Sequence, residues 1–266
     1  MTKPLQDKTV VVFGAAGSVG AGAACALAAD GAIVYCAGRR SGPLESLAAA
    51  IGESGGQARV IEVDAFDEQA VGTALEGVVA EAGRIDAVFN AVSPQLSVTD
   101  EVRPSLDIDL DSFTASLRSR ALVQFVTARA AARHMISAGG GTIIFLSATP
   151  ARGVAPMIAG DSAGFGAVEG MARCLAREWG PKGVRVVCLR SGGMPDTPRI
   201  QKVWETMGGY VGAPSEAMAE ASRAATLTGR MATVAETGEI VAFLASDRAA
   251  TLTGAIVNSS YGEVMD

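Results

Sequence analysis

The chain has 266 residues and a net charge of −6, with 49% hydrophobic residues and only 5% aromatic residues. An acidic chain without a run of lysine or arginine is a poor candidate for binding nucleic acid. No segment approaches the about 18 consecutive apolar residues of a membrane helix, and the first residues lack the apolar core of a signal peptide. We therefore expect a cytoplasmic protein that does not contact a membrane.

Short apolar runs alternate with alanine-rich helical segments along the chain. Runs rich in valine and isoleucine that end at glycine or a polar residue are typical of buried strands. We predict strands at residues 9–13, 32–37, 59–63, 87–89, 142–146, 184–189 and 255–257. We predict helices at residues 19–29, 44–51, 70–82, 110–137, 166–179 and 238–245.

This alternation predicts the fold class. Strand–helix–strand units make right-handed crossovers, which place the strands in one parallel sheet with helices on both faces. The expected architecture is α/β, a Rossmann-type doubly wound sheet of seven parallel strands, in a single domain over residues 1–266. Residues 194–225 are less regular. Ligands of such a sheet are expected at the carboxyl ends of its strands.

A glycine-rich turn follows the first strand and opens the first helix, with the sequence Gly-Ala-Ala-Gly-Ser-Val-Gly. Gly14 suits the tight turn, and Gly20 suits close packing of helix on strand. Gly17, Ser18 and Val19 place backbone N–H groups at the start of the helix, where a pyrophosphate binds. The turn therefore predicts a nucleotide site; the alternative is a strand–helix turn that no longer holds a nucleotide.

Two arginines, Arg39 and Arg40, end the second strand. A site selective for NAD(H) usually has an acidic residue there, which binds the 2′-hydroxyl of the ribose. Guanidinium groups instead suit a 2′-phosphate, which they can bind with paired hydrogen bonds. The sequence thus favours NADP(H) over NAD(H), unless both arginines are merely solvated.

Two parts of the chain resemble motifs of the short-chain dehydrogenase/reductase family. They are the glycine-rich turn and the segment Gly-Thr-Ile-Ile-Phe-Leu-Ser-Ala, which precedes the helix predicted at residues 166–179. The resemblance covers residues 8–262 and implies an NAD(P)-dependent oxidoreductase. It implies that Asp64 contacts the adenine. It also implies that Asn90, in Asn-Ala-Val-Ser, stands at the start of the family's Asn-Asn-Ala-Gly motif. Residues 194–225 resemble the family's mobile substrate loop.

The catalytic residues that this resemblance implies are missing from the chain. The family uses a tetrad of Asn, Ser, Tyr and Lys to move a proton beside the carbonyl while hydride arrives from the cofactor. Those four positions hold Arg120, Ala148, Asp161 and Phe165. The three tyrosines of the chain lie too far along the sequence to replace the missing one. We therefore predict that ordinary carbonyl reduction is impaired or absent.

Asp161 is not a simple substitute for tyrosine, since its reference pKa is near 3.9 against about 10 for tyrosine. One hypothesis is a structural ion pair between Arg120 and Asp161, and the alternative is a catalytic Asp161 acting as general acid or base. Ser147 and Thr149 flank the lost serine position and keep hydroxyl groups for a substrate carbonyl.

Several other residues receive plainer interpretations. His134 is the only histidine and is predicted to lie on the surface or at a helix end, so no metal site is expected. Arg190 either binds an anionic substrate or pairs with an acidic neighbour. Tyr210 packs or covers the cleft. The four cysteines are expected to be small buried hydrophobic residues without disulfides.

The resemblance also implies assembly through the helices at 110–137 and 166–179, as a homodimer or homotetramer, or as a hetero-oligomer with an active relative. Three functions remain open. The first is an NADP(H)-dependent oxidoreductase that uses unconventional residues on an unknown small molecule. The second is a non-catalytic NADP(H)-binding or structural subunit, and the third is a redox-neutral enzyme that uses Asp161.

Overall fold

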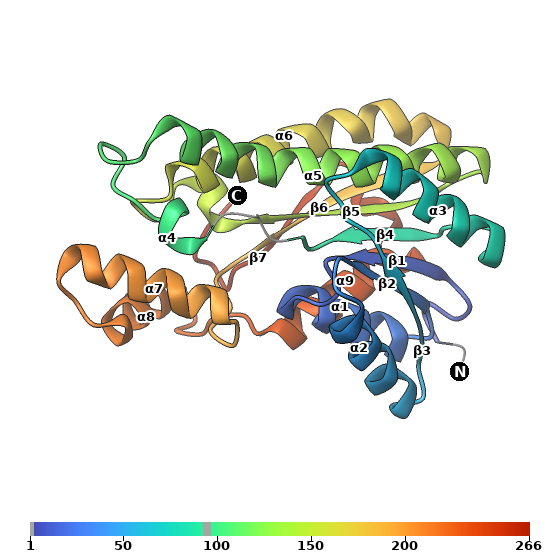
Figure 1. The fold of residues 1–266 in the computed structure, drawn as a ribbon, viewed down its shortest axis with the longest axis horizontal. Helices are drawn as coiled ribbons and strands as arrows, with labels where there is room; N and C mark the ends of the chain where they lie inside the picture. Colours follow the sequence, from blue (N-terminus) through green and yellow to red (C-terminus); the bar gives the residue numbers. More distant parts are fainter. Residues whose placement is uncertain (1–2, 93–96) are drawn as a thin grey trace.

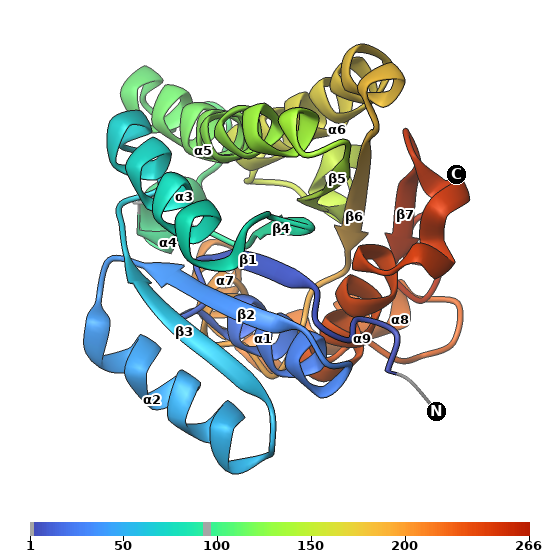
Figure 2. The same cartoon turned by 90° about the vertical axis from the view of Figure 1, so that its right-hand side faces the viewer.

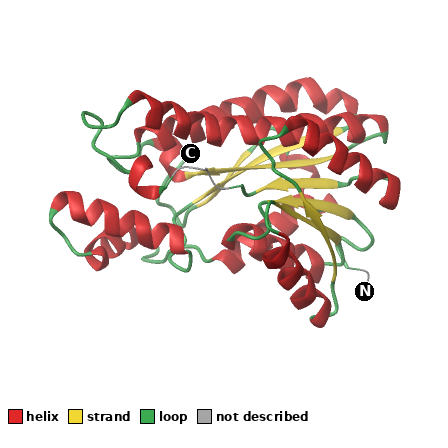
Figure 3. Cartoon of the chain, viewed as in Figure 1, coloured by secondary structure: helices red, strands yellow, loops and turns green. Residues whose placement is uncertain are grey.

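The computed structural model describes residues 3–92 and 97–266. Seven strands form one parallel sheet in the order β3-β2-β1-β4-β5-β6-β7, which confirms the predicted fold class. Helices cover both faces of this sheet, with α3, α5 and α6 on one side and α1, α2 and α9 on the other (Figure 1). Figure 3 shows the same layers by type of structure, with the strands between the helices.

The strands are β1 Thr9–Phe13, β2 Ile33–Gly38, β3 Gln57–Glu62, β4 Ala87–Asn90, β5 Gly141–Ala148, β6 Val184–Ser191 and β7 Ile256–Ser259. The α-helices are α1 Ser18–Ala29, α2 Ser41–Glu53, α3 Glu68–Ala82, α4 Val98–Glu101, α5 Leu110–Ser137, α6 Ala159–Trp179, α7 Pro198–Val211, α8 Ser215–Ala224 and α9 Val234–Ala245. Short 3-10 helices follow β5, α6 and α9: η1 Thr149–Arg152, η2 Gly180–Lys182 and η3 Asp247–Leu252.

The central strand β1 shows why the strands are continuous apolar runs. Val11 and Phe13 belong to the core under α3, α5 and α6, whereas Val10 and Val12 belong to the core over α1, α2 and α9. Successive side chains of a strand point to opposite faces, and here both faces are covered by helices. Figure 2, in which the right-hand side of the view in Figure 1 faces the viewer, displays the twisted sheet between these two layers.

Two parts of the predicted organisation require correction. The helix expected from residue 166 begins at Ala159, so Asp161 and Phe165 lie on α6 itself. The segment 194–225, expected to be irregular, contains the two helices α7 and α8. Within the described residues, no helix is both long enough and apolar enough to cross a membrane.

Candidate functional site

The glycine-rich turn lies where the sheet order reverses, between β1 and β4, which is the usual ligand position in doubly wound sheets. Gly14 has φ +75°, and a β-carbon there would lie 2.8 Å from the Ala91 carbonyl. A β-carbon on Gly20 would lie 2.2 Å from the Gly14 carbonyl oxygen. Gly17 caps α1 without any side-chain cap, so the first N–H groups of the helix keep their capacity to bind a phosphate.

The two arginines lie directly after β2, at the same edge of the sheet. Arg39 and Arg40 are both exposed, and Arg40 is the N-cap residue of α2. Asp64, after β3, accepts a hydrogen bond of 3.0 Å from the Phe66 backbone N–H, which shapes the turn into α3. The position of these residues is compatible with the predicted nucleotide site.

Asn90 is 2% exposed at the end of β4, and its hydrogen bonds are made within the protein. Its Nδ2 donates to the Val123 carbonyl at 3.1 Å and to Thr127 Oγ1 at 2.7 Å, and its Oδ1 accepts from the Val92 N–H at 2.9 Å. Asn90 therefore fixes α5 against β4, a role that the sequence did not show. Ser93, the last residue of its motif, lies outside the described residues.

Asp161, at the position that the resemblance assigns to tyrosine, forms an ion pair. Arg120 of α5 donates from Nε to Asp161 Oδ1 at 3.1 Å and from Nη2 to Oδ2 at 2.9 Å, so the predicted contact between these two side chains is present. Ser116 Oγ donates to Asp161 Oδ1 at 2.8 Å. The Arg120 guanidinium carbon also lies 4.4 Å from the centre of the Phe165 ring. Arg120 thus contacts both Asp161 and Phe165.

Small residues on α6 allow this contact. A β-carbon on Gly164 would lie 2.8 Å from Arg120 Cβ, and one on Gly160 would lie 2.8 Å from Ser116 Cβ. Helices α5 and α6 approach each other closely because these glycines have no side chain. That approach lets the fork of Arg120 reach the Asp161 carboxylate with two hydrogen bonds.

Two further charged residues, which no motif in the sequence indicates, join this pair. Arg199, in the first turn of α7, donates to Glu101 Oε2 of α4 and lies 3.7 Å from Asp161 Oδ2. Arg120 Nη2 is 4.0 Å from the same Glu101 oxygen. We call Glu101, Arg120, Asp161 and Arg199 the ion cluster. Glu101 and Arg199 lie in segments without clear periodicity, so no pattern in the sequence connects them.

The pKa values of the two carboxyl groups in the ion cluster are shifted in opposite directions. Burial raises the pKa of Asp161, but the Arg120 charge and hydrogen bonds outweigh it, with help from Arg199, so that this pKa lies below its usual value. For Glu101, burial and the Asp161 charge outweigh both arginines and raise its pKa. Asp161 is consequently an anion at neutral pH and holds no proton to donate.

Replacing Asp161 with asparagine is expected to lower the free energy of unfolding at pH 7 by about 1.5–3 kcal/mol, since Arg120 loses a charged partner. A carboxyl whose folded pKa is depressed stabilises the fold above its unfolded pKa of about 3.9, and this stability is lost as pH falls through the folded value. The difference between the two chains should therefore persist down to about pH 5 and shrink below about pH 4. Urea unfolding over a pH series measures it, and a constant difference would contradict the depressed pKa.

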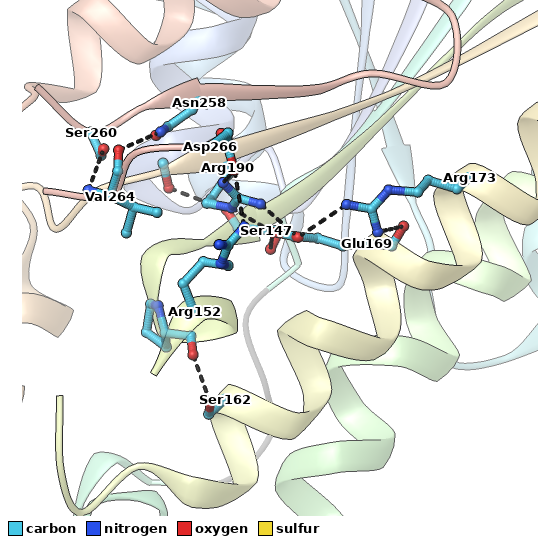
Figure 4. A network of polar contacts seen from close by, with 12 residues as sticks. Ser147, Arg152, Ser162, Glu169, Arg173, Arg190, Asn258, Ser260, Val264 and Asp266 are labelled. Carbon is cyan, nitrogen blue, oxygen red and sulfur yellow. Dashed lines mark hydrogen bonds and ion pairs between the residues drawn. The ribbon is translucent and has the colours of Figure 1, made fainter. Parts of the chain in front are cut away.

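A second network lies further along α6 (Figure 4). Arg190 of β6 donates from Nε and Nη2 to the two oxygens of Glu169 at 2.7 and 2.8 Å, and from Nη1 to Asp266 Oδ1 at 2.5 Å. Hydrogen bonds to Glu169 raise the already high pKa of Arg190 further. Arg190, which is 0% exposed, therefore pairs with acidic neighbours. Arg152 of η1 also reaches Asp266, at 3.1 Å.

The hydroxyl groups of Ser147 and Thr149 both make hydrogen bonds within the protein. Ser147 Oγ donates to Glu169 Oε1 at 3.0 Å, in the second network. The Thr149 hydroxyl hydrogen-bonds the carboxyl of Glu263, whose pKa is raised by burial. The sequence favours Ser147 and Thr149 as partners for a substrate carbonyl, but the structure brings neither of them into the ion cluster.

The remaining candidates lie away from the cluster. His134 is in the last turn of α5, as predicted, and Tyr210 is 49% exposed on α7. Cys25 and Cys174 are exposed, which corrects the expectation that every cysteine is buried. They lie on helix faces turned to solvent, and the chain forms no disulfide among its described cysteines. Groups of His, Cys, Asp and Glu suited to a metal ion are likewise absent from the described part of the chain.

A doubly wound parallel sheet with a glycine-rich turn at its reversal point is the architecture of α/β proteins of the dehydrogenase type. The family model described as enoyl-(acyl carrier protein) reductase matches residues 14–262. Since this match spans most of the chain, the protein belongs to the short-chain dehydrogenase/reductase family of oxidoreductases.

Its relatives cover nearly its whole length. D-threitol dehydrogenase of Mycolicibacterium smegmatis is 30% identical, over 97% of this chain and 94% of its own. Short-chain reductase protein NovJ of Streptomyces niveus is 33% identical over the same shares. Among solved structures, NAD+-bound xylitol dehydrogenase has a TM-score of 0.89 at 24% identity and covers 98% of this chain and 100% of its own. That last similarity concerns the fold alone.

Proposed function

We propose that the protein is an NADP(H)-binding oxidoreductase of this family in which the ion cluster replaces the proton relay of the usual tetrad. The observation that carries the proposal is the paired hydrogen bond between Arg120 and Asp161, at the positions of Asn and Tyr. The substrate is a small molecule whose proton exchange uses unconventional groups of the chain.

The nucleotide site supports the first half of the proposal. The backbone from Gly14 to Gly20 would hold the pyrophosphate, because the absence of side chains at its glycines leaves room close to the N–H groups of α1. Arg39 and Arg40 would hold a 2′-phosphate. When bound, the nicotinamide supplies a hydride to the substrate.

The residues of the tetrad positions support the second half. Asp161 is held as an anion with both oxygens hydrogen-bonded, so it cannot protonate an alkoxide at neutral pH. Phe165 has no N–H to hold the nicotinamide ribose, and Ala148 has no hydroxyl to orient a carbonyl. The chain therefore lacks a donor of the usual kind next to the carbonyl, and general acid catalysis contributes about 10²–10⁴ in rate.

A second candidate function is a non-catalytic NADP(H)-binding subunit. The ion cluster favours it, since four charged side chains occupy the place where a reacting group would lie. Such a subunit would act within a homodimer or homotetramer built on α5 and α6, or together with an active relative. A redox-neutral reaction through Asp161 is less well supported, because its pKa is lowered rather than placed near neutrality.

Replacing Arg39 and Arg40 with alanine is expected to weaken NADPH binding roughly ten- to hundredfold, because a phosphate loses one or two charged hydrogen-bond partners. NADH lacks the 2′-phosphate, so its affinity should change little and it serves as the matched control. Fluorescence titration measures both. Failure of the unaltered chain to bind NADPH at millimolar concentration would overturn the cofactor proposal, and an equal loss for both nucleotides would overturn the role of the arginines.

A further inference from the structure

The ion cluster gathers one charged side chain from each of four helices. Glu101 comes from α4, Arg120 from α5, Asp161 from α6 and Arg199 from α7. Their side chains are 0%, 11%, 11% and 31% exposed, respectively. Arg199 is thus the most accessible member, and it enters from α7, which lies to one side of the sheet (Figure 1). We call the other three members, Glu101, Arg120 and Asp161, the wall of the cluster.

This wall has an acceptor that no donor uses. Glu101 Oε1 is fully buried and has no hydrogen-bond partner among the described residues, although Oε2 of the same carboxylate is paired. Leaving a buried charged acceptor unpartnered is costly, and such groups are rare in folded proteins. The wall therefore offers more hydrogen-bond acceptors than the guanidinium of Arg199 fills.

The charges of the cluster balance only while Arg199 is present. Two arginines face two carboxylates in the arrangement observed. Without Arg199, the wall of Glu101, Arg120 and Asp161 would carry a net charge of −1 in a buried place. A buried uncompensated charge is strongly unfavourable, so such a place takes up either a proton or an opposite charge. Several acceptor oxygens side by side match a cation with several N–H donors.

We infer that this wall is a cation-binding site, in which the guanidinium of Arg199 is a tethered occupant that a substrate's guanidinium or primary ammonium group replaces when α7 moves away. The replacement breaks no covalent bond and exchanges one monovalent cation for another. Binding at this site requires neither NADP(H) nor turnover, so the inference stands or falls separately from the proposed function.

The test uses the Arg199→Ala variant of the full chain and two probes, guanidinium chloride at non-denaturing millimolar concentration and agmatine. Potassium chloride of equal ionic strength is the salt control. Isothermal calorimetry should show saturable binding of guanidinium to this variant at least about tenfold tighter than to the unaltered chain, where Arg199 competes for the place. Adding Glu101→Gln to the variant should weaken that binding at least about tenfold.

The matched control is Arg223→Ala on α8, which removes an arginine whose partner Glu220 is exposed and should create no binding. Arg199→Gln serves as a second vacating variant if the alanine variant folds poorly. Equal binding with and without Glu101→Gln, or no saturable binding by either vacating variant, would overturn the site. Displacement of Arg199 in the unaltered chain is measured by amide hydrogen exchange in residues 198–211. Saturating agmatine should accelerate the amide exchange of this helix, and unchanged protection of its amides would overturn the replacement of Arg199.

Discussion

Replacing Glu169 with alanine is expected to lower the free energy of unfolding by about 3–5 kcal/mol. Arg190 is 0% exposed and donates two hydrogen bonds to this carboxylate, so the change leaves a buried cation with Asp266 as its remaining acidic partner. Ser147 loses its acceptor as well. The cost exceeds that of a surface pair because water cannot take over the solvation of the buried guanidinium.

Denaturant unfolding measures this effect, with Glu178→Ala as the matched control. Glu178 lies on α6 too, but it is exposed, and its replacement should change stability by no more than about 0.5 kcal/mol. Equal and small effects of the two substitutions would show that the pair of Glu169 and Arg190 contributes little to the fold. Such a result would also remove the reason to assign Ser147 a structural role.

Restoring the tetrad is expected to produce the largest change in activity. A variant combining Arg120→Asn, Ala148→Ser, Asp161→Tyr and Phe165→Lys should reduce carbonyl compounds with NADPH at least about 10²-fold faster than the unaltered chain. The restored phenol can donate a proton at neutral pH once the lysine lowers its pKa, whereas Asp161 is an anion held by Arg120. Steady-state rates over a panel of aldehydes and ketones measure the gain.

The matched control carries Asp161→Phe in place of Asp161→Tyr and keeps the other three substitutions. It has nearly the same volume without the hydroxyl, so it should show no gain. Turnover by the unaltered chain at rates ordinary for the family would contradict the proposal that its proton relay is lost. A gain in the control equal to that of the restored variant would assign the effect to space in the site instead of proton transfer.

The segment 194–225 shows one limit of the sequence. Its prolines and glycines predict irregular structure, yet Pro198 lies in the first turn of α7, where its missing N–H costs nothing, and Thr197 caps that helix. Gly208 is inside α7, where a β-carbon would lie 2.4 Å from the Ala213 carbonyl oxygen. Proline and glycine, which often interrupt a helix, therefore begin α7 and allow it to pack closely here. Only the surrounding tertiary structure distinguishes the two uses.

The ion cluster could also be predicted only in part. The pair of Arg120 and Asp161 could be predicted, because the family resemblance assigns both positions to one site. Glu101 and Arg199 could not be predicted, since 98 residues separate them and neither lies in a periodic segment. Arg190 also left two alternatives open until the structure placed Glu169 beside it.

The sequence by itself determined the sheet and its glycine-rich turn, and it carries the proposal that the tetrad is lost. These features depend on local patterns of apolar, glycine and motif residues that repeat at fixed spacing along the chain. Only the tertiary structure decided which charges meet. Buried ions require partners, and the fold supplies them from whichever helices and strands happen to converge, so their identity depends on distance in space and not on distance in sequence.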